Sequence, residues 1–253
     1  MIELRNVTYH VKDETGEKDV LDNVSVKLDG RFVALTGPNG GGKSTLAKVI
    51  AGIIKPTFGR VFWDGEDITD LSVTERAKKG ISYAFQQPVR FKGLTVKDLL
   101  SIAAGKKATL SAACDYLSEV GLCARDYLDR EVNASLSGGE LKRIEIATRG
   151  TRLSLFDEPE AGIDLWSFSS LINVFENMRE KTQGDIIIIS HQERILNVAD
   201  TIVVLANGKI RKCGTRDEIL PEILGSGATC ETLKNKLSPA GDCTGKSAAR
   251  KKA

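Results

Sequence analysis

The sequence has no apolar run approaching the roughly 20 residues that a membrane-spanning helix needs. Its first residues, Met1 to Arg5, lack the basic-then-apolar order of a secretory signal. The five cysteines are odd in number and widely spaced, and they form no Cys-x-x-Cys pair, a pattern typical of reduced thiols rather than a disulfide framework. Formal charge nearly balances at +2, which gives no general attraction to nucleic acid or anionic membranes. We therefore expect a cytoplasmic chain with no nucleic-acid partner and no direct membrane insertion.

A glycine-rich stretch is the strongest signal that the sequence does contain. It reads Gly37-Pro38-Asn39-Gly40-Gly41-Gly42-Lys43-Ser44-Thr45 and lies between an apolar run and a helical pattern. Glycines let successive backbone N–H groups converge on phosphate oxygens, and a helix N-terminus adds its own unpaired N–H groups. Lys43 can reach the β- and γ-phosphates, and the Ser44 hydroxyl can coordinate Mg²⁺. An ordinary glycine turn is the alternative, but the full spacing favours a phosphate-binding loop.

The surrounding pattern predicts an α/β fold. Residues 2–35 alternate as short strands, with Lys12 to Asp19 as a polar hairpin loop, and predict an antiparallel sheet at the N-terminus. Later, the short apolar runs 153–156 and 186–189 are typical of buried parallel strands, and a helix over 165–181 separates them. A hairpin over Asn207-Gly208 follows.

Between residues 95 and 134 the apolar spacing becomes helical, which predicts a small helical insert. We expect the core to comprise 1–86 and 136–221, the insert 87–135, and a C-terminal extension 222–253 that is disordered from about residue 238. Cys114 and Cys123 in the insert are expected to be buried or half-buried thiols. Cys230 and Cys243 have no histidine or third cysteine at ligand spacing, so a metal site there is not favoured.

Four further groups of residues carry chemistry and follow the phosphate loop in order. Gln86 comes at a strand end, where its amide can touch Mg²⁺ and an attacking water. Ser137-Gly138-Gly139 opens a helix, with Ser137 as N-cap and bare N–H groups for an anion. Asp157 can hold Mg²⁺ and Glu158 can polarise a water, while His191 follows a strand and can bond the γ-phosphate. Each has a plain structural interpretation alone, and their order favours a nucleotide hydrolase.

These motifs resemble the ATP-binding-cassette (ABC) ATPases over residues 1 to about 221. The loop 37–45 corresponds to Walker A, Gln86 to the Q-loop, Leu136 to Glu140 to the LSGGE signature, Asp157-Glu158 to Walker B, Ala161 to Asp164 to the D-loop and His191 to the H-loop. The resemblance implies ATP and Mg²⁺ as ligands. It also implies an ATP-dependent self-dimer, in which each signature caps the γ-phosphate held by the other copy.

Within that family, the segments 84–89, 137–143 and 191–196 resemble the SufC group, the ATPases of the SUF iron–sulfur cluster assembly system. Glu140 stands where transport cassettes more often have glutamine, and Gly162 where they more often have alanine. The main hypothesis is therefore an ATPase that drives a soluble SufB- or SufD-like scaffold, and the alternative is the nucleotide-binding subunit of a membrane importer. An ATP-dependent switch with little turnover is a third class, which Glu158 and His191 disfavour.

One position departs from the family pattern. The adenine-stacking aromatic expected in the early hairpin is replaced by Val11, and Tyr9 on the same strand face is predicted to be core rather than a stacking residue. Because base stacking is worth about 1–3 kcal/mol, phosphate and Mg²⁺ contacts should dominate binding. Discrimination between ATP and GTP should then be weak.

Overall fold

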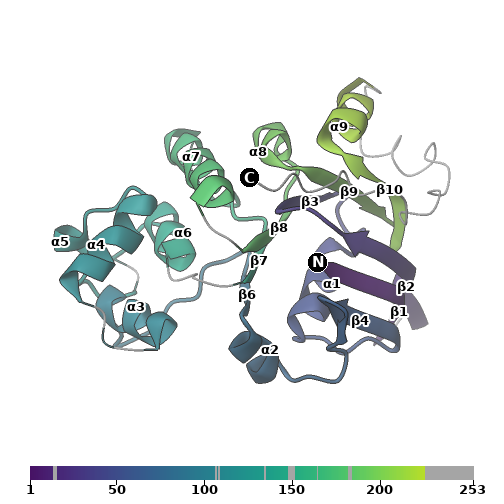
Figure 1. Cartoon of the computed structure of the whole chain (residues 1–253), viewed down its shortest axis with the longest axis horizontal. Coiled ribbons are helices and arrows are strands. Elements are labelled where there is room, and N and C mark those ends of the chain that lie inside the picture. Colours follow the sequence, from purple (N-terminus) through teal and green to yellow (C-terminus); the bar gives the residue numbers. More distant parts are fainter. Residues whose placement is uncertain are drawn as a thin grey trace. The chain divides into compact units, whose positions relative to one another are not determined.

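An antiparallel sheet is built from the first strands of the chain (Figure 1). The computed structural model describes residues 1–225 except 14–15, 106, 108, 134, 148–151, 164 and 182–183. It divides into two units, one made of Met1–Lys79 with His191–Ala253 and one made of Gly80–Ser190. In the first unit the sheet has the order β2-β1-β4-β5. Its strands are β1 (Ile2–Asp13), β2 (Gly16–Leu28), β4 (Phe58–Trp63) and β5 (Glu66–Asp67).

The hairpin between β1 and β2 is tighter than the sequence suggested. Pairing continues from His10 opposite Asp19 to Asp13 opposite Gly16, so the predicted loop over Lys12 to Asp19 is wrong. Ladder hydrogen bonds join backbone groups, and exposed polar side chains are therefore compatible with an extended pair. The predicted antiparallel sheet itself is confirmed. Tyr9, predicted to be core, is only half-buried.

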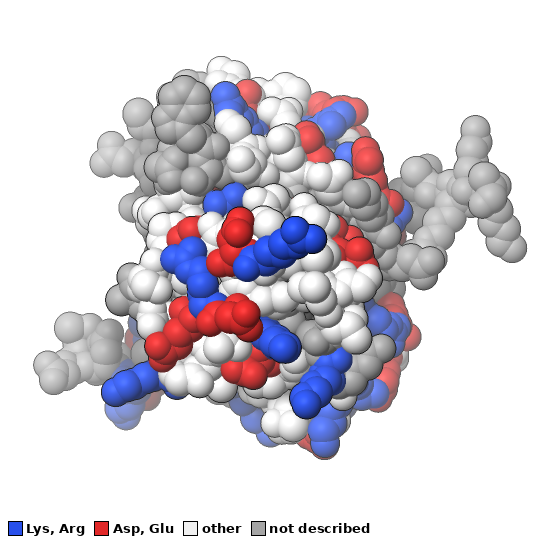
Figure 2. Space-filling view, turned by 90° about the vertical axis from the view of Figure 1, so that its left-hand side faces the viewer, with Lys and Arg blue, Asp and Glu red and all other residues white. Residues whose placement is uncertain are grey.

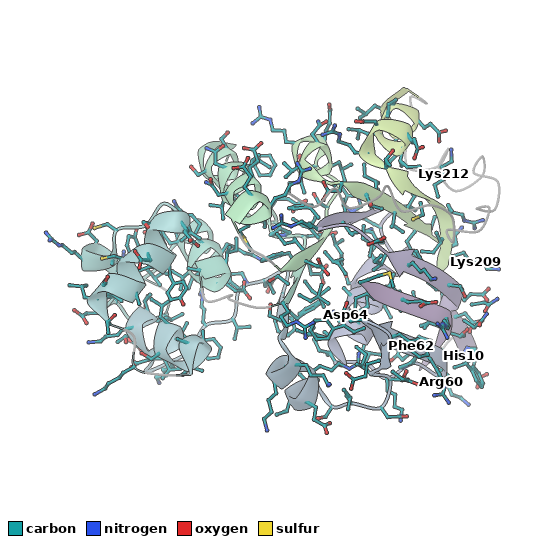
Figure 3. All side chains as sticks on the ribbon, in the orientation of Figure 1. His10, Arg60, Phe62, Asp64, Lys209 and Lys212 are labelled. Carbon is teal, nitrogen blue, oxygen red and sulfur yellow. The ribbon has the colours of Figure 1, made fainter. Side chains whose placement is uncertain are left out.

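Strand β4 shows how the sheet separates its two faces. Val61 and Trp63 are buried at 0% and 5% exposure, while Arg60 and Phe62 alternate with them on the opposite face (Figure 3). The Arg5 guanidinium lies 4.2 Å from the centre of the Phe62 ring, a cation–π contact on that outer face. The inner face supplies the core of this part of the unit.

The remaining elements of the first unit surround a short parallel pair of strands. Strand β3 (Phe32–Thr36) runs parallel to β9 (Thr201–Ala206), with Leu35 opposite Val203. β9 joins β10 (Lys209–Thr215) through Asn207 and Gly208, whose φ angles of 51° and 72° are those of the predicted two-residue turn. The helices are α1 (Lys43–Ala51), α2 (Val73–Lys79), α8 (Glu193–Val198) and α9 (Arg216–Gly225).

The second unit contains three parallel strands and the helical segment. β6 (Ile81–Ala84), β7 (Leu153–Asp157) and β8 (Asp185–Ile189) pair in that order, and every residue of β7 is buried. Its helices are α3 (Val96–Ala104), α4 (Leu110–Glu119), α5 (Ala124–Tyr127), α6 (Gly138–Ala147) and α7 (Leu165–Lys181). The α/β fold class with an N-terminal antiparallel sheet is confirmed. Among the described residues, no helix is long and apolar enough to cross a bilayer.

The thiols of the helical segment are more exposed than expected. Cys114 and Cys123 are both exposed, so the prediction of buried or half-buried thiols is wrong. Helix α4 buries Ala113 and Leu117, which leaves Cys114 on its solvent side, and Cys123 stands at the N-terminus of α5. Cys230, Cys243 and the predicted disordered tail lie outside the described residues.

The face that carries α3 to α5 intermixes acidic and basic side chains (Figure 2).

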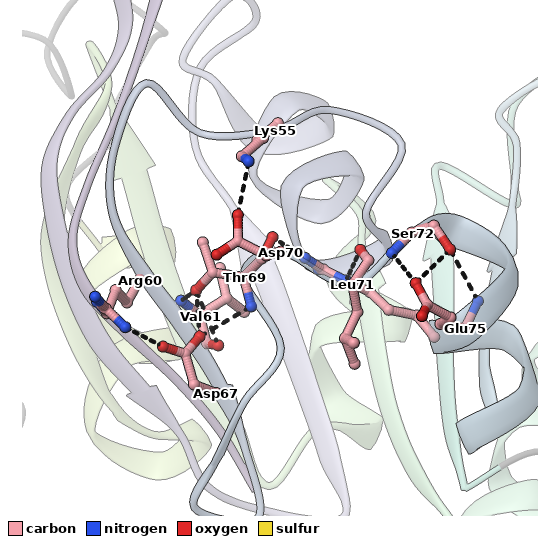
Figure 4. A network of polar contacts seen from close by, with 10 residues as sticks. Lys55, Arg60, Val61, Asp67, Thr69, Asp70, Leu71, Ser72 and Glu75 are labelled. Atoms are coloured by element: carbon pink, nitrogen blue, oxygen red, sulfur yellow. Dashed lines mark hydrogen bonds and ion pairs between the residues drawn. The ribbon is translucent and has the colours of Figure 1, made fainter.

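A buried arginine ties the end of α1 to the segment that follows β5, whose polar contacts around Asp67 and Thr69 are drawn in Figure 4. Arg76 on α2 is 1% exposed. Its Nη1 donates to the carbonyl oxygens of Val49 and Ile50, both at 2.8 Å, and Nη2 donates to that of Thr69 at 3.0 Å. The Val49 and Ile50 carbonyls are at the C-terminus of α1, where cations are favoured and intrahelical partners run out.

The same network holds Asp67 ionised. The Thr69 hydroxyl donates to the Asp67 carboxylate at 2.6 Å, and Arg60 pairs with its other oxygen at 2.6 Å. The bonds from Thr69, with a smaller contribution from Arg60, lower the pKa of Asp67 to about 2. The loop between β5 and α2 is thus held by two sets of contacts, those of Arg60 and Thr69 with Asp67 and that of Arg76 with the Thr69 carbonyl.

Arg76→Met should destabilise the chain by about 2–4 kcal/mol, because several buried carbonyls lose their donors together. Arg60→Met is the matched control, since this exposed arginine makes a surface ion pair that should be worth less than about 1 kcal/mol. Urea unfolding measures both changes. Equal losses for the two variants would contradict the role assigned to Arg76.

Candidate functional site

The phosphate-binding loop lies directly against the backbone of two strands. Gly37 has a φ of 135°, and a Cβ atom there would lie 2.0 Å from the carbonyl oxygen of Leu205. Gly42 has a φ of 100°, and a Cβ atom there would lie 2.7 Å from the carbonyl oxygen of Val20. Only glycine tolerates both the backbone conformation and the close approach. β2 and β9 therefore fix the path of the loop.

The β9–β10 turn is a third support for the loop, and sequence reasoning missed it. The N–H of Gly208 donates to the Gly41 carbonyl at 3.1 Å, and the Gly208 carbonyl accepts from the N–H of Asp22 at 2.9 Å. Gly208 thus joins β2 to the phosphate loop. The Asn207-Gly208 signal was interpreted only as a hairpin turn, because nothing in the local pattern shows which segment the turn contacts.

Lys43 begins α1 and is buried at 5% exposure. Its ammonium donates to the carbonyl oxygens of Gly37 and Pro38 at 2.8 and 3.0 Å, so its side chain folds back along the loop. Gly42 caps the helix without a side-chain hydrogen bond. The first-turn N–H groups are therefore not covered by a cap side chain, as an anion site at a helix N-terminus requires. Asn39 and Gly40 are exposed, and Ser44 and Thr45 are half-buried.

In the second unit, a tyrosine holds the carboxylate that ends β7. Asp157 is 4% exposed, and its Oδ2 accepts a hydrogen bond from the hydroxyl of Tyr83 on β6 at 2.6 Å. Burial, and then the bond to Asp157, raise the pKa of Tyr83, so the phenol stays a donor. Tyr83 was not predicted as a site residue. Its position at a buried strand end, three residues before Gln86, was the only available signal.

Glu158 has a strained backbone and a defined side-chain partner. Its φ is 43°, a region that a non-glycine residue rarely adopts, and its N–H donates to the Ile189 carbonyl at 3.0 Å. Its Oε2 accepts from the amide Nε2 of Gln86 at 2.7 Å. Such strain persists where surrounding structure enforces it, often at functional sites. The structure thus brings together the two residues that the sequence assigned to water activation.

The serine-glycine motif starts α6 as predicted. The Ser137 hydroxyl accepts from the Glu140 N–H at 3.2 Å, and the Glu140 carboxylate accepts from the Ser137 N–H at 2.7 Å, a reciprocal capping box. Ser137 and Gly138 are exposed, and Gly139 is half-buried. A Cβ atom at Gly138 would lie 3.8 Å from the carbonyl oxygen of Gly162, whose own φ is 75°.

A buried lysine joins α6 to the end of β6. Lys142 is 2% exposed, and its ammonium donates to the Phe85 carbonyl at 2.6 Å, immediately before Gln86. In the sequence this lysine cannot be distinguished from a solvated one on the polar side of a helix. The contact explains how the position of Gln86 depends on α6.

The predicted site residues fall in both units. The phosphate loop and the exposed His191 belong to the first, while Gln86, Asp157, Glu158 and the motif from Ser137 belong to the second. In the second unit Gln86 and Asp157 would offer an amide oxygen and a carboxylate, and in the first Ser44 would offer a hydroxyl; each is an oxygen donor of the kind that suits Mg²⁺. When bound, Mg²⁺ would offset charge on the β- and γ-phosphates.

Comparison with known proteins agrees with these features. A family model described as ABC transporter matches residues 21–161. An uncharacterized ABC transporter ATP-binding protein of Methanocaldococcus jannaschii, MJ0035, is 37% identical over 81% of this chain and 86% of its own. The energy-coupling factor transporter ATP-binding protein EcfA2 of Clostridium acetobutylicum is 32% identical, over 88% of this chain and 82% of its own.

A solved structure shows the same fold. The dimeric ATP-binding cassette MJ0796, bound to ADP and Pi in a post-hydrolysis state, has a TM-score of 0.75 and 25% identity, covering 85% of this chain and 99% of that one. The chain belongs to the ABC transporter ATP-binding family, and it is an ATP-hydrolysing cassette of that family.

Tyr83→Phe should raise the Mg²⁺ concentration needed for half-maximal ATP hydrolysis by about 10-fold, because Asp157 loses the hydrogen bond that orients it. ATP affinity measured without Mg²⁺ should not change. Tyr116→Phe, an exposed tyrosine on α4, is the matched control. An unchanged Mg²⁺ midpoint in Tyr83→Phe would show that Asp157 does not need this contact.

Proposed function

We propose that two copies of this chain close on two ATP molecules and that hydrolysis reopens them, driving conformational change in a partner protein. Glu158 polarises the attacking water, Gln86 orients it with Mg²⁺, and His191 bonds the γ-phosphate. The observation that carries this proposal is the hydrogen bond between Gln86 and Glu158 beside the strained end of β7. The dimeric state of the related MJ0796 cassette supports the closure of two copies.

The residues of the phosphate loop and of the signature take complementary parts in this proposal. The loop from Gly37 to Thr45 holds the phosphates of one ATP, with Lys43 on the β- and γ-phosphates. Ser137, Gly138 and Gly139 cap the γ-phosphate held by the other copy. The exposure of Ser137 and Gly138 at the start of α6 supports a contact made to a second chain.

The segment that follows Gln86 is the proposed partner surface. Val89 and Phe91 are 43% and 41% exposed at the start of the predicted insert 87–135, and Phe85, just before Gln86, is 40% exposed. Apolar side chains clustered on a surface mark interaction sites more often than isolated ones do. The Phe91 N–H donates to the Val132 carbonyl at 3.0 Å, which ties this surface to the end of the insert.

For the partner, the names of the relatives favour an importer, because CysA of Brucella melitensis, 32% identical over 83% of this chain, is named a sulfate/thiosulfate import ATP-binding protein. EcfA2 is named as the ATP-binding protein of a transporter, and the matched family model carries the same description. We therefore place the nucleotide-binding subunit of a membrane importer, the alternative of the sequence analysis, ahead of the iron–sulfur hypothesis. In this function the partner is a separate membrane-spanning chain.

The SUF-type scaffold stays a second candidate because of two residues. Glu140 and Gly162 depart from the transport cassettes toward the SufC group, and both have defined structural consequences here. Glu140 accepts hydrogen bonds on both carboxylate oxygens, and Gly162 adopts a φ of 75° that disfavours alanine. A soluble SufB- or SufD-like partner would dock on the same apolar surface.

Glu158→Gln keeps the shape of the side chain and removes the carboxylate that activates water. Turnover should fall by about 10²–10⁴-fold while ATP still binds. The variant should accumulate as an ATP-bound dimer, detectable by sedimentation. ATP hydrolysis at the wild-type rate would show that Glu158 is not the base.

Phe91→Glu should release the partner, because a charge replaces an exposed apolar contact. Phe58→Glu, at a 62% exposed phenylalanine of β4 in the first unit, is the matched control. The measurement is affinity capture of the chain from fractionated native cells. Co-purification from membranes with a multi-span protein supports the importer. A soluble partner that carries iron would overturn it in favour of the SUF-type scaffold.

A further inference from the structure

Both carboxylate oxygens of Glu140 are occupied by donors from different parts of the second unit. Oε2 accepts from the N–H of Ser137 at 2.7 Å, which completes the capping box of α6. Oε1 accepts from the hydroxyl of Tyr127, the last residue of α5, at 2.5 Å. The Glu140 side chain is 19% exposed; its bond from Tyr127 is partly buried, and its bond from Ser137 is exposed to solvent. One carboxylate therefore connects α5 to the signature serine.

Arg130 reinforces the same connection. Its Nη1 lies 3.6 Å from Oε1 of Glu140, its guanidinium lies 5.0 Å from the centre of the Tyr127 ring, and its Nη2 donates to the Ser135 carbonyl at 3.2 Å. The hydrogen bond to Glu140, followed by burial, raises the pKa of Tyr127 and keeps its hydroxyl a donor. The turn after α5 therefore contacts the signature at Glu140 and the residue just before it, Ser135.

We propose that Tyr127 is a positioning residue for ATP-driven closure: through Glu140 it sets the orientation of Ser137. Ser137 is exposed, and its direction depends on the capping box, in which the Glu140 carboxylate holds the serine N–H. Tyr127 holds the other oxygen of that carboxylate and so fixes its rotation. This inference rests on the proposed contact of Ser137 with ATP held by a second copy.

We call the path from Tyr127 through Glu140 to Ser137 the relay. It explains why a glutamate stands at position 140. A carboxylate only accepts hydrogen bonds, and both of its oxygens face donors here, whereas a glutamine offers one acceptor and one donor. Glutamine can serve Ser137 only if the Tyr127 hydroxyl turns to accept from the amide, and it loses the attraction to Arg130. The ATP-dependent dimer of Glu140→Gln should therefore be weaker than that of the wild type but stronger than that of Glu140→Ala.

The relay also gives the helical segment a route to the ATP site. α5 packs against α4, and α4 packs against α6. A partner that displaces α5 would move Tyr127, and with it the carboxylate that anchors Ser137. Partner docking and nucleotide-driven closure would then share one set of hydrogen bonds.

The test measures ATP-dependent dimerisation by sedimentation in the Glu158→Gln chain, where dimers accumulate. Tyr127→Phe should weaken the dimer about three- to tenfold, less than the full loss of a charged hydrogen bond, because Tyr127 acts on Ser137 only through Glu140. Glu140→Ala should weaken it further, and the Tyr127→Phe, Glu140→Ala double variant should equal Glu140→Ala alone. Tyr116→Phe should match the parent, and ATP affinity of every monomer should be unchanged.

Two results would overturn the relay: a Tyr127→Phe dimer as tight as the parent, or additive losses in the double variant. Ser137→Arg separates this failure from that of the proposed function. If Ser137→Arg abolishes dimers and Tyr127→Phe has no effect, only the relay is wrong. If Ser137→Arg still forms dimers, the proposed role of the signature is wrong. The relay, which depends on that role, is then wrong as well.

Discussion

The close approach of the phosphate loop to the backbones of β2 and β9 is the contact on which the rest of the site depends. A side chain at Gly37 or Gly42 would collide with the carbonyl of Leu205 or Val20, so these strands determine where the loop can run. The loop in turn places the N-terminus of α1 and the buried ammonium of Lys43. Gly208 adds a third support from the β9–β10 turn. Residues far apart in the chain therefore shape one anion site.

In the second unit, hydrogen bonds at strand ends fix the positions of the predicted site residues. Tyr83 holds Asp157, Gln86 holds Glu158, and Lys142 holds the carbonyl that precedes Gln86. Each of these bonds constrains the direction of the group that it holds. The positive φ of Glu158 is sustained because β7 is buried along its whole length. In the proposed function, water activation depends on this preorganised strand edge rather than on Glu158 alone.

The sequence predicted the parts of the fold whose cause is local. The phosphate loop, the helix N-cap at Ser137 and the Asn207-Gly208 turn each follow from nearby residue types and spacing. The errors concern exposure and pairing, which depend on residues elsewhere. The β1–β2 ladder continues through polar positions, and Cys114 lies on the open side of α4. Tyr83, Tyr127 and Lys142 could not be found because their partners are distant in the sequence. The SUF-type partner inferred from the segments 84–89, 137–143 and 191–196, with Glu140 and Gly162, is less well supported by the relatives, which include an import ATP-binding protein.

The central claim is that each ATP is held by the phosphate loop of one copy and the signature of another. Mixing Lys43→Ala chains with Ser137→Arg chains tests it most directly, because in a mixed dimer one site combines both defects and the other combines both intact elements. ATP hydrolysis should be nearly absent in each variant alone and should return in the mixture, with at most one working site per dimer. Full activity of either variant alone, or no recovery on mixing, would contradict the shared site.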